Sequence, residues 1–90
     1  MDLIIETKQY KYTYDHLEMS YIHNFISNKI GMCAKTCKKY YLTKKEMQEL
    51  LNYLKQLKFS FDAQKERLIE QLSNMEMLMI TGDTASFYFW

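Results

Sequence analysis

Residues 81–90, TGDTASFYFW, decide the fold class, because they favour a strand after a long helical stretch. Gly82 and Asp83 predict a turn. After the turn the residues alternate with the period of a strand and are rich in strand formers. One face of this strand would carry Ala85, Phe87 and Phe89, and the other Thr84, Ser86, Tyr88 and Trp90. We therefore predict a short strand over residues 84–90.

A strand needs a partner, and the other extended candidate is LIIETKQYKYTY, near the start of the sequence. β-Branched and aromatic residues dominate it, and Tyr10, Tyr12 and Tyr14 share one face of a period-two strand. We predict one strand over about residues 3–13, paired with the strand over residues 84–90. Because a two-stranded ribbon alone is marginal, we expect it to pack on helices or to meet another chain.

Three amphipathic helices are predicted between the two strands, over about residues 15–30, 44–58 and 62–79. Residues 31–42 are interpreted as a connector with room for one helical turn. The predicted fold class is therefore α+β and mostly α-helical, with short strands near both termini. We expect residues 1–90 to form a single domain.

Capping residues support the ends of these helices. Asp15 is placed to cap the first helix, with Glu18 reaching back as in a capping box, and Gly31 suits the left-handed residue after the last turn. Thr43 and Glu46 form a second capping box, followed by a seam of leucines. The third helix is expected to begin at Ser60 or Asp62 and to pack antiparallel on the second.

Composition narrows the function classes. The chain carries 12 basic and 11 acidic residues, for a net charge of +1, which argues against a purely electrostatic nucleic-acid binder. No apolar run approaches the roughly 18–20 residues that span a membrane. The first residues lack the features of a signal peptide, so we expect a cytoplasmic protein with free thiols.

Metal binding and catalysis have weak support in the sequence. The obvious soft ligands are His16, His23, Cys33 and Cys37, and their spacing matches no standard zinc pattern. Zinc is kept only as an alternative, and no metal or cofactor is predicted. A nucleophilic pair of His23 with one of the cysteines lacks a recognisable oxyanion hole. We therefore predict that the protein is not an enzyme.

Aromatic residues reach 16% of the chain, with eight tyrosines, and such a composition is common at interfaces. We predict that a partner contacts two sets of rings, which also favours a homo-oligomer. The sets are Tyr10, Tyr12 and Tyr14, and Phe87, Tyr88, Phe89 and Trp90. Internal packing of the same rings is the competing interpretation.

A basic run, KTCKKYYLTKK at residues 35–45, suggests a second binding mode. Lysines and tyrosines together can hold a single nucleic-acid strand by phosphate contact and base stacking. The residues concerned are Lys35, Lys38, Lys39, Tyr40, Tyr41, Lys44 and Lys45. The run contains no arginine, so sequence-specific recognition is not expected. A solvated loop with its tyrosines turned into the core explains the same run, and a third alternative is a small nucleotide held between protomers.

Two stretches, YIHNFI at residues 21–26 and KKYYLTKKEMQELLNYL at residues 38–54, resemble a group of small uncharacterised phage-encoded proteins. The resemblance covers about residues 20–57. It implies no known activity, but it implies an accessory protein that acts on a host system, including a defence system. We therefore predict a non-enzymatic phage-type inhibitor in the host cytoplasm, which binds and inhibits or redirects a host macromolecule, with a host protein as the expected partner.

Overall fold

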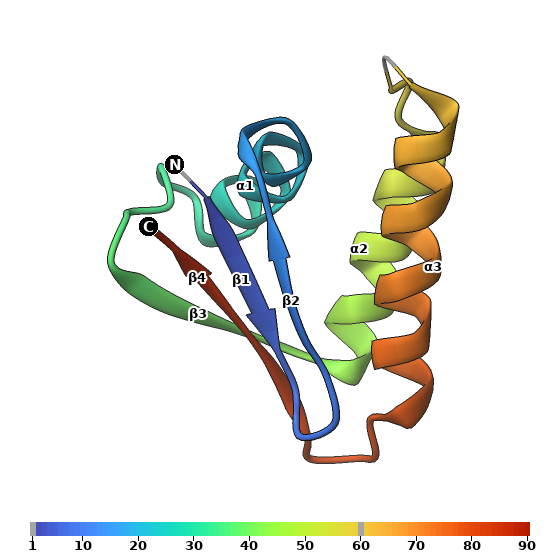
Figure 1. Ribbon diagram of the computed structural model, residues 1–90. Coiled ribbons are helices and arrows are strands. Elements are labelled where there is room, and N and C mark those ends of the chain that lie inside the picture. The colour runs from blue at the N-terminus through green and yellow to red at the C-terminus, as the bar shows by residue number, and fades with distance from the viewer. Residues whose placement is uncertain (1, 60) are drawn as a thin grey trace.

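The computed structural model describes residues 2–59 and 61–90, which form a four-stranded antiparallel sheet and three helices (Figure 1). The elements in chain order are β1 (Leu3–Glu6), β2 (Lys11–Tyr14), α1 (His16–Ile30), β3 (Lys38–Thr43), α2 (Lys44–Gln56), α3 (Asp62–Leu78) and β4 (Thr84–Phe89). Helices make up 51% and strands 23%, so the α+β class is confirmed. The prediction of a mostly α-helical fold with two short terminal strands is wrong, because the sheet is substantial.

The N-terminal segment is a hairpin and not the single strand predicted over residues 3–13. β1 and β2 pair antiparallel, joined by a short turn. The Thr7 N–H donates to the Tyr10 carbonyl (2.8 Å), and the Tyr10 N–H donates to the Thr7 hydroxyl (3.2 Å). Leu3 lies opposite Tyr14 in this register, so odd residues of β1 share a face with even residues of β2. A single strand would have put them on opposite faces.

The segment predicted as a connector contains β3, the second correction to the sequence-based fold. β3 pairs antiparallel with β4 along its whole length, from Lys38 opposite Phe89 to Thr43 opposite Thr84. Leu42 points to the core and is buried. The connector before β3 ends at Cys37, which has a positive φ of 58°.

β4 is an inner strand, although it follows every other element in the chain. The strand order is β2-β1-β4-β3, so β4 is bonded to β1 on one side and to β3 on the other (Figure 1). The predicted alternation is confirmed, since Ala85, Phe87 and Phe89 are all completely buried. Full burial of one such ring contributes on the order of 2–3 kcal/mol. The most apolar strand is thereby shielded on both edges.

The three helices lie within two residues of their predicted limits. The Asp15 carboxylate accepts a bond from the Leu17 N–H, and Gly31 adopts the expected left-handed conformation. The capping box of Thr43 and Glu46 is present. Caps of α3 differ from expectation: Phe61 occupies the cap position without a side-chain bond, and Asp62 is already helical.

The alternative cap of α3, Ser60, lies outside the described residues. Glu18 also departs from its predicted role, because it does not complete a capping box at the start of α1. Its side chain turns inward, is only 3% exposed, and pairs with Arg67 of α3. The Gln64 amide is a second donor to the same carboxylate oxygen (3.4 Å).

The helices and the sheet form two layers. Leu3, Ile5, Leu42 and the apolar residues of β4 fill the core between them, together with the seams of the three helices. Among the described residues, no helix lies over the opposite face of the sheet, where the side chains are exposed or half-buried. None of the helices in residues 2–59 and 61–90 is both long and apolar enough to cross a membrane.

Candidate functional site: the uncovered face of the sheet

The face of the sheet that the helices leave uncovered is here called the open face, and side chains of all four strands converge on it. The register of the strands gives its members, since residues directly opposite one another share a face. They are Ile4 and Glu6 of β1, Lys11 and Thr13 of β2, Lys39, Tyr41 and Thr43 of β3, Thr84, Ser86 and Tyr88 of β4, and Trp90. The open face is thus a mixed aromatic, hydroxyl and basic surface.

Three aromatic rings run diagonally across the open face. Tyr88 lies on β4, and Trp90 follows two residues later, directly after the end of that strand. Tyr41 is the diagonal neighbour of Tyr88 on β3. The Tyr41 and Trp90 side chains are 59% and 52% exposed. Trp90 is held in place by paired backbone bonds with Asp2, of 2.6 and 2.9 Å. Tyr41 and Trp90 therefore stand on hydrogen-bonded backbone and face solvent.

Cys37 adjoins the middle ring of this diagonal. A side-chain hydrogen bond with Cys37 raises the pKa of the Tyr88 hydroxyl, so the phenol stays protonated well above neutral pH. Cys37 itself is an exposed free thiol. Its backbone N–H donates to the Phe89 carbonyl (2.6 Å), which fixes it beside the sheet.

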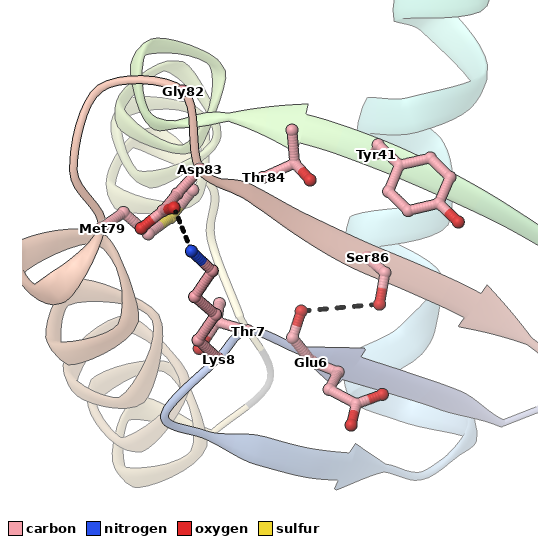
Figure 2. A pocket seen from close by; sticks show the side chains of 9 residues that line it. All are labelled: Glu6, Thr7, Lys8, Tyr41, Met79, Gly82, Asp83, Thr84 and Ser86. Atoms are coloured by element: carbon pink, nitrogen blue, oxygen red, sulfur yellow. Dashed lines mark hydrogen bonds and ion pairs between the residues drawn. The ribbon is translucent and has the colours of Figure 1, made fainter.

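A groove of about 380 Å³ lies at the turn end of the open face (Figure 2). Its lining residues are Glu6, Thr7, Lys8, Tyr41, Met79, Gly82, Asp83, Thr84 and Ser86. Figure 2 shows the side chains of Tyr41, Thr84 and Ser86 projecting from β3 and β4. Four of the nine lining residues carry a hydroxyl group and three carry a charge, so the groove suits a polar ligand with several hydrogen-bonding groups.

An ion pair closes one side of the groove. The Lys8 ammonium lies 3.2 Å from the Asp83 carboxylate, whose side chain is only 13% exposed. Asp83 also accepts a bond from the Ile80 N–H (3.0 Å), and this bond, followed by Lys8, holds the pKa of Asp83 below its usual value. Asp83 therefore shapes the turn and remains ionised at neutral pH.

Basic side chains divide into two groups by their partners. Lys8, Lys29, Lys44 and Arg67 each lie within 4 Å of a carboxylate, and Lys65 donates to two backbone carbonyls. Within residues 2–59 and 61–90, no such ion pair involves Lys11, Lys35, Lys38, Lys39, Lys45, Lys55 or Lys58. Four of these seven lie in or beside β3, in a segment without acidic residues. The positive charge that is not compensated nearby is therefore concentrated along that edge.

The predicted tyrosine set lies on the helix-facing side of β2. Tyr14 is buried, and its hydroxyl donates to the Gln71 side chain (2.8 Å). Burial, and then the charge of Glu18, raises the pKa of Tyr14 well above its ordinary value. Tyr10 and Tyr12 are half-buried against the core. Partner binding by these three rings remains a prediction, and only the half-buried pair offers any surface for it.

The predicted C-terminal set is divided by the alternation of β4. Phe87 and Phe89 are completely buried, so they are part of the core and offer no surface to a partner. Tyr88 and Trp90 belong to the open face. Sequence reasoning therefore identified two residues of this face but did not separate them from their buried neighbours.

The predicted lysine and tyrosine run is also divided between two sides. Lys39 and Tyr41 belong to the open face, and Lys45 is exposed in the first turn of α2. Tyr40 turns to the other side of the sheet, where its ring centroid lies 6.1 Å from that of Phe89. Its hydroxyl oxygen accepts a hydrogen bond from the Lys35 N–H (2.8 Å).

The Lys38 ammonium lies over the Tyr40 ring, 5.5 Å from the ring centroid. Lys44 is occupied, since its ammonium donates to the Glu76 carbonyl (2.6 Å) and lies near the Glu76 carboxylate. Five residues of the predicted nucleic-acid set are therefore accessible: Lys35, Lys38, Lys39, Tyr41 and Lys45.

The four alternative zinc ligands do not converge. Across the described part of the chain, no group of three or more His, Cys, Asp or Glu side chains is placed to hold a metal ion. Cys33 Sγ lies 4.0 Å from His23 Nε2, and that nitrogen is 2.8 Å from the Ala34 carbonyl. Because a carbonyl only accepts, Nε2 carries the proton and His23 is not a base for Cys33.

Sequence reasoning missed the groove, because Lys8 and Asp83 are brought together only by the hairpin that it did not predict. The role of Ile4, Thr84 and Ser86 in the open face was likewise hidden until the strand order was known. Comparison with known proteins adds no assignment: no protein-family model, no curated protein and no solved structure matches this chain.

Proposed function

We propose that this chain is a non-catalytic accessory protein that binds a host macromolecule through the open face and thereby inhibits or redirects it. The observation that carries the proposal is the exposure of Tyr41 on β3 and of Trp90 directly after β4, since both residues are more than half exposed. Large exposed rings on an ordered surface are typical of binding sites. The resemblance to phage-encoded proteins supports a role against a host system, in the host cytoplasm.

Tyrosine enrichment is the reason to include a host protein among the expected partners, and self-association through the same rings is proposed as well. Tyr88 lies between the two exposed rings, and Ile4 extends the surface onto β1. Such a surface works by shape and contact and needs no catalytic group. A binder of this kind would act by occupying its target.

The proposal is tested by retention of host macromolecules on the immobilised protein. The double variant Tyr41→Ser/Trp90→Ser is expected to lose the partner retained by the unmodified chain. Phe61→Ser is the matched control, because Phe61 is also exposed (62%) but lies at the joint between α2 and α3. Equal retention by all three proteins would contradict the proposal, as would retention that depends on Phe61.

A further inference from the structure

Resting on the proposed function, we infer that the partner of the open face is single-stranded nucleic acid. Bases stack on Trp90, Tyr88 and Tyr41, while phosphates lie along the lysines of the β3 edge. The juxtaposition of β3 and β4 creates this arrangement, since it brings the rings of one strand beside the lysines of the other.

The geometry of the rings suits separate bases. Residues two apart on a strand are spaced by about 6.6–6.8 Å, and diagonal cross-strand neighbours by about 7–8 Å. Trp90, Tyr88 and Tyr41 therefore form a row in which each ring is available to its own base. A four-stranded sheet whose uncovered face stacks two or three bases is a general solution for binding single strands. Paired bases are already stacked and would not meet these rings.

The positive charge of the lysines in and beside β3 favours nucleic acid over protein as the partner. Lys39 lies directly opposite Tyr88, on the same face. Lys35 and Lys38 precede it and Lys45 follows, and none of the four has an ion pair with a described carboxylate. Lysine is depleted at protein–protein interfaces, whereas rows of lysine beside aromatic rings track a phosphate backbone.

Of the acidic residues near the open face, Asp2 lies opposite Trp90 at one end of this row, whereas Glu6 and Asp83 lie away from it. Glu6 is separated from β3 by the whole of β4, and Asp83 is neutralised by Lys8 at the groove. A strand following the diagonal would thus pass from Trp90 toward Tyr41 with Lys39 on its outer side. The hydroxyls of the groove next to Tyr41 are placed to bond the sugar or phosphate that follows.

The intrinsic fluorescence of Trp90, the only tryptophan of the chain, gives a direct test. Titration with an oligothymidylate or oligouridylate of about 15 nucleotides is expected to quench its emission, because a base stacks on the ring. With about four phosphates contacted, affinity should fall about 50-fold between roughly 50 and 200 mM salt. A duplex of the same length is expected to quench weakly.

Substitutions separate stacking from phosphate contact. Tyr41→Ala is expected to weaken oligonucleotide binding about tenfold, while Phe61→Ala leaves it unchanged. Lys39→Gln should weaken binding and reduce the slope of log K against log salt by about 0.7. Lys58→Gln is its control, since Lys58 is exposed and also lacks a carboxylate partner within the described chain, but follows the far end of α2.

Alkylation of the two free thiols gives a footprint that needs no substitution. Cys37 adjoins Tyr88 on the open face, whereas Cys33 adjoins His23. Bound oligonucleotide is expected to slow the labelling of Cys37 several-fold and to leave Cys33 unaffected. Equal effects on the two thiols would count against the inference.

The two proposals fail in different ways. If no oligonucleotide quenches Trp90 or protects Cys37 at low salt, the nucleic-acid inference is overturned. Should a host protein then be retained in a Tyr41- and Trp90-dependent manner, the open face is a protein interface and the proposed function stands. If neither occurs, both are wrong.

Discussion

Glu18 in α1 and Arg67 in α3 form an ion pair that joins two helices across the core. The carboxylate is almost fully buried, while the guanidinium is more than half exposed. An ionised carboxylate in such a site is tolerated only when a charged donor compensates its lost hydration. Arg67 is the only arginine in the sequence, and it occupies this position.

Replacing Arg67 by methionine is therefore expected to destabilise the protein by about 2 kcal/mol, since it leaves Glu18 without its charged partner. The expected loss is below that of a fully buried pair because Arg67 is partly solvated. Urea denaturation measures it, with Lys58→Met as the control. Adding Glu18→Gln to Arg67→Met should recover part of the loss. An Arg67→Met midpoint equal to that of the control would show that the pair is dispensable.

Phe87 and Ser86 are neighbours on β4 that face opposite sides of the sheet. Phe87→Ala is expected to cost about 3–5 kcal/mol, enough to unfold a domain of this size, and Phe87→Leu about 1–2 kcal/mol. Ser86→Ala, on the open face, should cost less than about 0.5 kcal/mol. Thermal melts of the three variants make the comparison. Similar losses at residues 86 and 87 would contradict the assigned faces.

The rings of Tyr10 and Tyr12 stack with their centroids 5.7 Å apart and pack on the core. The double change Tyr10→Ser/Tyr12→Ser is thus expected to lower the free energy of unfolding by about 2–3 kcal/mol. It should leave the quenching of Trp90 by oligonucleotide unchanged under folding conditions. If the denaturation midpoint stays the same while partner binding is lost, these rings form the interface that the sequence predicted.

The Thr43 hydroxyl accepts the Glu46 N–H at the start of α2 (3.2 Å). Thr43→Ala is expected to cost about 1 kcal/mol, because one N–H of the first turn loses its partner. Thr13→Ala, an exposed threonine on β2, is the control and should be nearly neutral. Urea midpoints at neutral pH measure both. A loss of less than a few tenths of a kcal/mol would mean that water replaces the cap.

Glu46 gives the cap a pH dependence. The pKa of its carboxyl is lowered, first by the bond from the Thr43 N–H and then by Lys29. The resulting stability is fully present above the unfolded pKa of about 4.3 and is lost as the pH falls through the lower folded value. Glu46→Gln is therefore expected to flatten the stability profile between about pH 5 and pH 3, whereas Glu70→Gln on exposed α3 should not. Parallel profiles for the two variants would refute this.

Local signals in the sequence were enough to place the helices. The capping box at Thr43, the leucine seam that follows it and Gly31 each act within a few residues, and the structure confirms each of these predictions. The hairpin was missed because Lys8 and Gln9 form its turn without the glycine, asparagine or proline that usually marks one. β3 was missed because its strand conformation depends on pairing with β4, which is distant in sequence.

In the candidate site, too, local features were predicted from the sequence, whereas contacts between distant segments were not. Tyr41 and Lys39 were singled out in one predicted set, and Tyr88 and Trp90 in another. No local pattern indicated that the two sets share one surface, because that depends on the order of strands in the sheet. Likewise, a net charge of +1 concealed the basic edge, since all 11 acidic residues of the sequence lie outside residues 35–45.

The inner position of β4 also constrains how the chain acquires its structure. β1 pairs with β2 nearby in the sequence, but its other neighbour, β4, lies about 80 residues further along. The contact order of the sheet is therefore high, and folding is expected to be slow for a domain of this length. On the ribosome, the hairpin and β3 emerge first and stay apart until residues 84–89 are synthesised. Cotranslational folding is therefore limited to the helices and the β1–β2 hairpin, and assembly of the four-stranded sheet is a late event.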